Sequence, residues 1–145
     1  MFQKPKRVVN TVFLHCSASD NPKHDDISVI RKWHVEERGW SDVGYHYFIT
    51  KEGEVQEGRD LEKIPAAQKG FNKGSIAICL HGLLLENFTE EQFDALRQLC
   101  SEINEAYDGN ITFHGHREVN PRKSCPVFDV DEVLGLDENK KLRLV

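Results

Sequence analysis

Two histidines and a cysteine stand close together in the segment from 114 to 126, which reads HGHREVNPRKSCP. Imidazole nitrogen and thiolate sulfur are ligands of zinc, and a catalytic zinc ion takes three protein ligands and leaves its fourth position to water. His116 and Cys125 offer two of the three. The best candidate for the third is His15, which follows the apolar run VVNTVFL. A ligand at the end of a strand points into a cleft, so these residues predict a metal centre at strand ends.

Each of these residues also has an ordinary structural interpretation. An isolated histidine is usually a surface residue or a hydrogen-bonded core residue, and a single cysteine is more often a small buried hydrophobic residue than a ligand. The surroundings of Cys125 favour ligation, because Pro121 and Pro126 restrict the backbone and remove N–H donors on either side of it. We therefore expect a rigid loop around the cysteine, which suits metal binding.

Motifs along most of the chain resemble those of one enzyme family. They are FLHCSAS (13 to 19), IRKWHVEERGWSDVGYHYFI (30 to 49), GEVQEGRD (53 to 60), KGFNKGSIAICL (69 to 80), NFTEEQ (87 to 92) and HREVNPRKSCPVFD (116 to 129). In this order they are similar to the zinc-dependent N-acetylmuramoyl-L-alanine amidases, above all to those of the phage lysozyme type. Peptidoglycan-recognition proteins share the fold of this family, and some of them lack the cysteine and only bind.

The resemblance implies a site, a cofactor and a substrate. It implies that His15, His116 and Cys125 hold one zinc ion per chain. It also implies that Tyr45, in GYHYF, and Lys123, two residues before the cysteine, complete the catalytic site. The implied reaction is hydrolysis of the amide bond between N-acetylmuramic acid and L-alanine, so the partner is peptidoglycan or a muropeptide. The implied role is that of a phage or prophage endolysin.

The reaction suggests what the two catalytic residues do. Attack on an amide carbonyl places negative charge on its oxygen, and the ammonium group of Lys123 would stabilise that charge. Tyr45 would either orient the attacking water or accept its proton through a chain of hydrogen bonds, and both roles stay open at this point.

The histidine ligands should themselves have hydrogen-bond partners. A ligating histidine normally donates its second nitrogen to a carboxylate or a carbonyl, and we expect Glu118 or Asp129 to be that acceptor. Three further histidines either make such contacts, bind substrate, or are ordinary polar residues at strand ends: His46, His81 and His114.

Three features depart from the family pattern. The loop between His116 and Cys125 is one residue longer than in the phage enzymes. Ala67 stands where many relatives have a histidine on the substrate side, and the loop over residues 83 to 86 is shorter. These departures affect the path of a loop and the substrate contacts, but they remove no ligand.

Hydrophobic patterning predicts strands alternating with helices. Strands are expected at 8–14, 45–50, 54–58, 75–80 and 111–113, and helices at 27–38, from Thr89 to about Asp108, and at 129–134. Glu52-Gly53 indicates a hairpin between the second and third strands, so that pair is antiparallel. The fold class is therefore α/β, with one central mixed β-sheet flanked by helices. The segment from 60 to 73 has no sustained periodicity and is expected to be a loop that forms one wall of the cleft.

Length and composition set further limits. A chain of 145 residues fits one domain, because roughly 68–70% of the unfolded surface can be buried at this size. We expect a single amidase domain over residues 1–145, with its core at about 8–134 and a poorly ordered charged tail from Asp137. No apolar run is long enough for a membrane span, and no apolar region of a signal peptide follows the basic N-terminus. We therefore expect cytoplasmic synthesis and action on the cell wall after release.

Charge and cysteine content argue against a nucleic-acid-binding protein and against a disulfide-rich protein. The net charge is −5 with both signs interspersed, whereas nucleic-acid binding needs a basic patch. The cysteines form no CxxC pair, so Cys16, Cys79 and Cys100 are expected to be free and mostly buried. We expect a monomer.

Two other functions compete with the amidase. One is a peptidoglycan-binding module without catalysis, which typically lacks the cysteine or the tyrosine that this chain has. The other is a hydrolase with Cys125 or Cys16 as nucleophile beside a histidine. Pro126 counts against Cys125 in that role, because the residue after such a nucleophile would normally offer an N–H donor.

Overall fold

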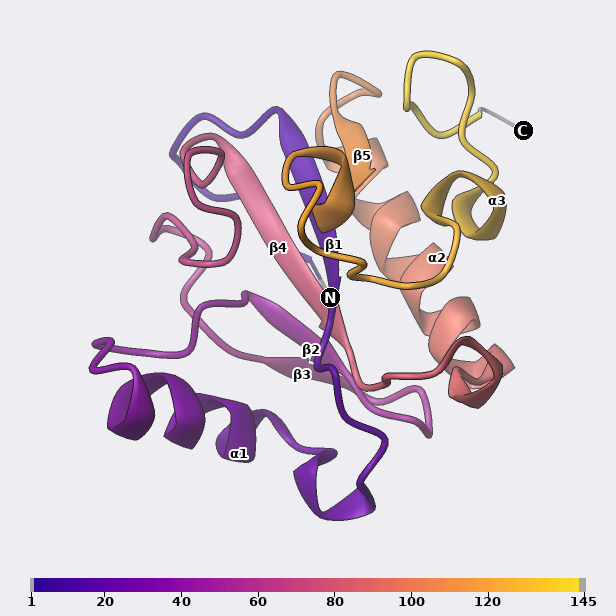
Figure 1. The fold of residues 1–145 in the computed structure, drawn as a ribbon. Coiled ribbons are helices and arrows are strands. Elements are labelled where there is room, and N and C mark those ends of the chain that lie inside the picture. Colours follow the sequence, from indigo (N-terminus) through magenta and orange to yellow (C-terminus); the bar gives the residue numbers. More distant parts are fainter. Residues whose placement is uncertain (1, 144–145) are drawn as a thin grey trace.

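A five-stranded sheet forms the centre of the computed structural model, which describes residues 2 to 143 (Figure 1). The strands are β1 (Thr11–Cys16), β2 (Tyr47–Ile49), β3 (Val55–Glu57), β4 (Ser75–Leu80) and β5 (Thr112–Gly115). Their order across the sheet is β3-β2-β4-β1-β5. β1 runs parallel to both β4 and β5, β2 runs parallel to β4, and β3 is antiparallel to β2. The predicted mixed sheet is thus confirmed.

The three inner strands β1, β2 and β4 are the most deeply buried part of the sheet. All six residues of β4 are buried, as expected for a strand that is covered on both faces. The sequence predicts the first strand at 8–14, whereas β1 begins at Thr11, where its ladders with β4 and β5 begin. Val8 lies outside these ladders and is exposed. The strand also ends later than predicted, at Cys16, so His15 lies inside β1 and not after it.

Helices cover both faces of the sheet, as Figure 1 shows. The long helix α2 (Glu90–Ala106) buries Leu96, Cys100 and Ile103 against one face, and the predicted capping box of Thr89 and Gln92 begins it. On the other face, α1 (Ile27–Lys32) packs its apolar side chains against β2 and β4. The helix continues as a π-helical turn over 33–37 and gives way to Gly39, which has a positive φ of 69°.

Alternation along β1 decides which side chains face the cleft. Val12 and Leu14 belong to the core under α2. Because successive side chains of a strand point to opposite faces, Phe13 and His15 point away from α2. The ring of His15 accordingly packs against the ring of Tyr45, with centroids 5.1 Å apart.

The predicted hairpin and loop are both present. Gly53 turns between β2 and β3 with a φ of 85°, and a Cβ there would lie 2.7 Å from the carbonyl oxygen of Glu91, so a larger residue would be strained and would clash. Residues 60 to 73 form no helix or strand, as the sequence predicts. Tyr45, predicted to begin a strand, instead lies two residues before β2, although its carbonyl oxygen accepts a hydrogen bond from the N–H of Arg59 (2.8 Å).

The C-terminal segment packs against the rest of the molecule. After the short helix α3 (Val130–Leu134), the chain returns so that the carbonyl oxygen of Lys140 accepts the N–H of Phe113 at 2.9 Å. The ammonium group of Lys140 also contacts Asp131 at 2.7 Å. The prediction of a poorly ordered tail is therefore wrong for residues 137 to 143, while 144 and 145 lie outside the described residues.

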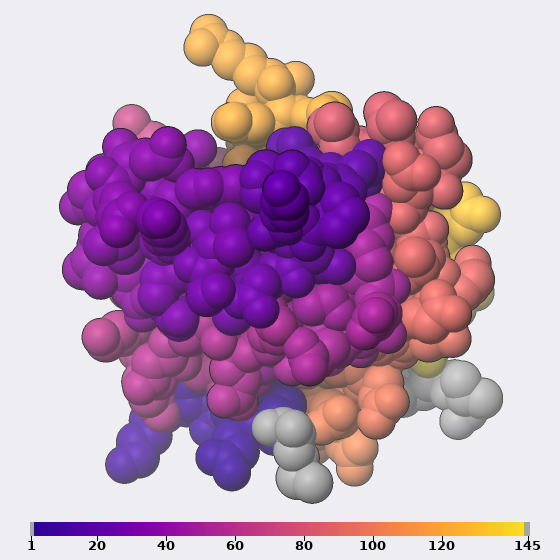
Figure 2. Space-filling model, turned by 90° about the horizontal axis from the view of Figure 1, so that it is seen from below, coloured from indigo at the N-terminus to yellow at the C-terminus, as the bar shows by residue number. Residues whose placement is uncertain are grey.

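One face of the molecule is formed largely by the N-terminal half of the chain (Figure 2). Figure 2 shows that half, in indigo to magenta, over most of one face, with α2 in salmon along one flank. Within residues 2 to 143, no helix has the length and apolar character that crossing a membrane requires.

Candidate active site

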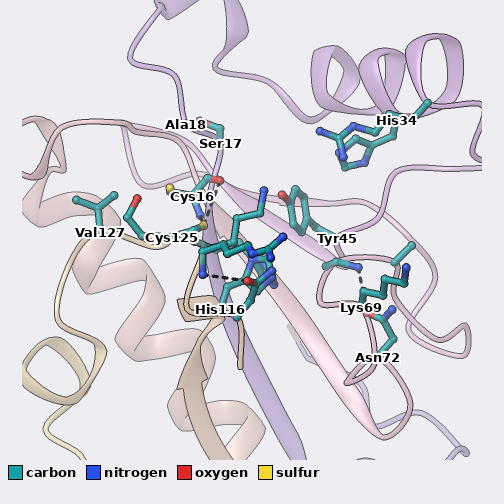
Figure 3. Close-up of a pocket in the computed structure, with 18 of the residues that line it drawn as sticks. Cys16, Ser17, Ala18, His34, Tyr45, Lys69, Asn72, His116, Cys125 and Val127 are labelled. Carbon is teal, nitrogen blue, oxygen red and sulfur yellow. Dashed lines mark hydrogen bonds between the residues drawn. The ribbon is translucent and has the colours of Figure 1, made fainter. Parts of the chain in front are cut away.

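A cleft of about 620 Å³ lies where β1 and β5 end. Ligands of open α/β sheets commonly bind outside the carboxyl ends of strands. The floor of this cleft carries His15, His116 and Cys125, and its walls include Tyr45 and the loop residue Ala67. Figure 3 shows Tyr45, His116 and Cys125 in this cleft. The loop over 60 to 73 therefore forms one wall, as predicted from its sequence.

The structure brings the three candidate ligands together. One potential ligand atom of each of His15, His116 and Cys125 lies within 4.8 Å of the other two. The reason lies in the sheet, because β1 and β5 are parallel neighbours with Leu14 opposite Gly115. The residues that follow this pair, His15 on β1 and His116 after β5, therefore lie at the same edge of the sheet.

Backbone contacts hold Cys125 beside these histidines. Its Sγ accepts the N–H of Cys16 at 2.8 Å, and its carbonyl oxygen accepts the N–H of Arg117 at 2.9 Å. A Cβ on Gly115 would lie 2.9 Å from the ring of Pro126, so glycine allows the loop to pack against the end of β5. All four cysteines are free; Cys16, Cys79 and Cys100 are buried, as predicted.

Burial sets the charge of the candidate ligands. It lowers the pKa of His15 to about 3, with a smaller contribution from His116. Burial and then the charge of Lys123 lower the pKa of His116. Both rings are thus neutral at neutral pH, which is the form that binds a metal. For Cys125, the neighbouring Cys16 side chain and burial raise the pKa of the thiol. Two neutral imidazoles and one cysteine sulfur suit zinc.

The candidate ligand His15 has a different partner from the two carboxylates that the sequence suggested. Glu118 accepts from the ring of His114 (3.1 Å) and the N–H of Gly115 (2.6 Å), while Asp129 caps α3. The ring Nε2 of His15 instead meets Oε1 of Gln68 at 2.8 Å. No local pattern distinguishes Gln68 from the other polar residues of its loop, which is why sequence reasoning missed it.

The other histidines have structural contacts. His34 accepts the N–H of Gly44 at 2.8 Å. The ring of His46 lies 3.1 Å from the N–H of Ala77 and 2.8 Å from the carbonyl oxygen of Lys63. The remaining three contact polar groups: His24 meets Ser19, His81 meets Ser17 and Asn21, and His114 meets Thr112 and Glu118.

The two residues expected to be catalytic both line the cleft. The ring of Tyr45 lies between those of His15 and His34, with centroid distances of 5.1 and 5.5 Å. Burial raises the pKa of Tyr45 well above its ordinary value. Lys123 is exposed in the loop before Cys125, so its ammonium group is free to meet a substrate.

The charged side chains that line the cleft are all basic. They are Arg38, Lys69, Arg122 and Lys123. No aspartate or glutamate among residues 2 to 143 lines it, although the chain as a whole has a net charge of −5. The cleft therefore attracts negatively charged ligands. The sequence does not reveal this, because the basic residues come from three separate segments.

Comparison with known proteins agrees with this geometry. The pattern of the family described as N-acetylmuramoyl-L-alanine amidase matches residues 5–128. The endolysin of Enterobacteria phage T3 is 38% identical over 133 residues, which cover 88% of this chain and 86% of the relative.

Two solved structures share the fold. The N-acetylmuramoyl-L-alanine amidase LysC from Clostridium intestinale has a TM-score of 0.78 at 27% identity, over 89% of this chain and 85% of that one. The complex of the peptidoglycan-recognition proteins LCa and LCx with tracheal cytotoxin has a TM-score of 0.75 at 25% identity, over 87% and 80%. From the family match and the phage relative, the chain belongs to the N-acetylmuramoyl-L-alanine amidase family.

Proposed function

We propose that this amidase cleaves the bond between N-acetylmuramic acid and L-alanine with one zinc ion that His15, His116 and Cys125 hold. A zinc ion with three such ligands has a position for water and polarises a substrate carbonyl. The observation that carries the proposal is the meeting of three ligand atoms within 4.8 Å of one another at the floor of the cleft.

The protein environment prepares these ligands in different ways. His15 and His116 are neutral because burial lowers the pKa of each ring, so neither has to lose a proton before it binds. Cys125 does have to lose one. The N–H of Cys16, 2.8 Å from its Sγ, stabilises the thiolate, since a hydrogen bond to the charged form of a group favours that form.

Tyr45 and Lys123 act on the substrate in this proposal. Because burial raises the pKa of Tyr45, its hydroxyl stays protonated and can donate a hydrogen bond. This favours orientation of water or the substrate carbonyl over the proton-accepting role. Lys123 supplies positive charge where the amide oxygen becomes negative, which is the usual way to stabilise such a transition state.

The charge of the cleft supports a muropeptide as the ligand. Peptide stems of peptidoglycan carry free carboxylates, and the basic side chains of the cleft offer them partners. The substrate places the action of the enzyme at the cell wall, in the manner of an endolysin. All five proposed site residues come from one chain, so a monomer is sufficient.

The thiol hydrolase with Cys125 as its nucleophile is a weaker alternative. A nucleophilic cysteine needs a lowered pKa so that its thiolate is available. Here the Cys16 side chain and burial raise the pKa of Cys125. Its neighbour Pro126 offers no N–H to an oxyanion.

The decisive experiment measures zinc and cleavage together. Zinc content of the purified protein and release of L-alanine-bearing peptides from peptidoglycan are compared for wild type, Cys125→Ala and Cys100→Ala. Cys100 is the matched control, because it is a free cysteine that α2 buries in the core and it does not line the cleft. We expect one zinc ion per chain and cleavage in wild type and Cys100→Ala, and loss of both in Cys125→Ala. Zinc without cleavage would indicate a binding module, and cleavage by metal-free protein would refute the mechanism.

A further inference from the structure

We propose that Gln68 is a positioning residue that fixes the tautomer and ring orientation of His15 and thereby strengthens zinc binding. The inference rests on the proposed function, because it concerns the same metal centre. It assigns a role to a residue of the loop wall that lies 53 positions from His15 in the sequence.

The contact between these side chains is completely enclosed. His15 is 1% exposed and Gln68 is 0% exposed, and the ring Nε2 lies 2.8 Å from Oε1 of the amide. A polar group without access to water needs a protein partner, because leaving it unpaired is unfavourable. Each of the two side chains therefore depends on the other.

The surroundings of Gln68 determine which way its amide points. Its nitrogen lies 2.6 Å from Oγ of Ser75 and 3.4 Å from the carbonyl oxygen of Phe71. A carbonyl oxygen can only accept a hydrogen bond. The hydroxyl of Ser75 gives its single hydrogen to the carbonyl oxygen of Asn72, at 2.8 Å, so it too accepts from Gln68. The amide NH₂ thus faces these acceptors, and the oxygen faces His15.

This orientation determines the tautomer of the ring. An acceptor opposite Nε2 requires that Nε2 carry the hydrogen, so in the neutral ring of His15 the lone pair is on Nδ1. We infer that Nδ1 is the atom that His15 offers to a metal shared with His116 and Cys125. The other tautomer would place an N–H where a ligand lone pair is needed, and it would also break the contact with Gln68.

The loop holds Gln68 in place before any ligand binds. The N–H groups of Ala67 and Gln68 both donate to Oδ1 of Asn72, at 3.0 and 2.9 Å. This closes the turn from which the Gln68 side chain reaches β1. The residues on either side, Ala67 and Lys69, line the cleft, so the same turn forms the wall of the cleft and orients a ligand on its floor.

The test separates the hydrogen bond from packing by two substitutions at position 68. Gln68→Met keeps the length of the side chain but has no acceptor, whereas Gln68→Glu keeps an acceptor for His15. The matched control is Gln92→Met. Gln92 is likewise 0% exposed, but its amide donates to the carbonyl oxygens of Ile49 and His81.

The first measurement is the zinc dissociation constant of each folded variant, by competition with a chromophoric chelator. Loss of a partner of a metal-ligating histidine typically weakens binding about 10–100-fold, and we expect this for Gln68→Met. Gln68→Glu and Gln92→Met should bind zinc about as tightly as wild type, or more tightly. Equal affinity of Gln68→Met and wild type, or an equal loss in Gln92→Met, would overturn the role of Gln68.

The second measurement is the ¹⁵N NMR spectrum of the His15 ring in zinc-free and zinc-loaded protein. Wild type should show hydrogen on Nε2 in both, and zinc-free Gln68→Met should show a mixture of tautomers. A zinc-free wild type with hydrogen on Nδ1 would refute the proposal. Failure of wild type to bind zinc would instead refute the proposed function, and the zinc-free spectra would still test the hydrogen bond.

Discussion

Burial sets the protonation states of the side chains on which the cleft chemistry depends. It is the main cause that lowers the pKa of His15 to about 3 and of His34 to about 4, and it raises the pKa of Tyr45. These groups are therefore neutral hydrogen-bonding partners near neutral pH. The positive charge of the cleft comes from lysine and arginine side chains such as the exposed Lys123.

Removal of the Tyr45 hydroxyl should slow catalysis without loss of the metal. In Tyr45→Phe the ring still packs between His15 and His34, but the donor is gone, so we expect kcat to fall by roughly 10². Tyr47→Phe is the control, because Tyr47 belongs to the core under α2 and does not line the cleft. Steady-state cleavage rates and zinc content check both variants. A kcat of Tyr45→Phe equal to wild type would exclude a catalytic role for the hydroxyl.

Loss of the Lys123 charge should also reduce kcat at constant zinc content. Lys123 lines the cleft two residues before a proposed ligand, and removal of a group that stabilises an oxyanion typically costs about 10²–10³ in rate. We expect the lower end for Lys123→Ala, because solvent screens an exposed charge. Lys73→Ala, an exposed lysine outside the cleft, should be unaffected. If Lys123→Ala turned over like wild type with zinc bound, the assigned role would be wrong.

At the scale of elements, Asp20 joins the segments that follow β1 and β4. Its carboxylate accepts from the N–H groups of Leu83 and Leu84 (3.0 and 3.1 Å), from the Asn87 side chain (3.0 Å) and from the ammonium group of Lys51 (2.9 Å). Leu83 lines the cleft. The short loop over 83 to 86 is therefore held at the edge of the cleft by one carboxylate.

Asp20→Ala should destabilise the fold measurably. It leaves two backbone N–H groups and a lysine without their acceptor, and hydrogen bonds to charged groups contribute about 1.5–3 kcal/mol each. We expect the free energy of unfolding to fall by about 2 kcal/mol, since water can replace part of the contacts. Urea unfolding measures this change.

The control is Asp94→Ala. Its carboxylate is 74% exposed and pairs with Arg97 in the next helical turn, so its removal should change stability by less than about 0.5 kcal/mol. Equal stability of Asp20→Ala and Asp94→Ala would show that Asp20 does not hold the loop.

At the scale of the whole molecule, five buried histidines make stability depend on pH. Burial is the main cause that lowers the pKa of His15 to about 3 and those of His34 and His46 to about 4. It is also the main cause that lowers the pKa of His81 and of His116. The unfolded chain should titrate near the ordinary value of about 6.5. Above that pH both states are neutral and the contribution to stability is complete. Below it the unfolded state binds protons that the folded state does not, so stability decreases as pH falls toward 4.

The expected slope is large enough to measure. Each histidine contributes up to about 1.4 kcal/mol per pH unit within this window. Urea unfolding of zinc-free protein at several pH values between about 4.5 and 6.5 tests it. His46→Gln, which removes one of these groups, should reduce the slope by up to about 1.4 kcal/mol per pH unit. A free energy of unfolding that stays constant or rises as pH falls through this window would contradict the prediction.

The sequence by itself determined the elements that local patterns encode. The apolar run SIAICL became the inner strand β4, Thr89 and Gln92 formed the capping box, and Gly53 made the turn between β2 and β3. His15, His116 and Cys125 were also recognisable as a candidate ligand set, because imidazole nitrogen and thiolate sulfur are the ligands that zinc takes. These features depend on residue type, period and turn chemistry, which are readable within a short segment.

Tertiary structure decided the contacts between segments that are distant in sequence. The start of β1 at Thr11 follows from its ladders with β4 and β5. Gln68 and not Glu118 meets His15, because the loop packs across the end of β1 while Glu118 turns toward His114. Such contacts depend on strand register and on the path of loops in space, and no short segment of sequence specifies either.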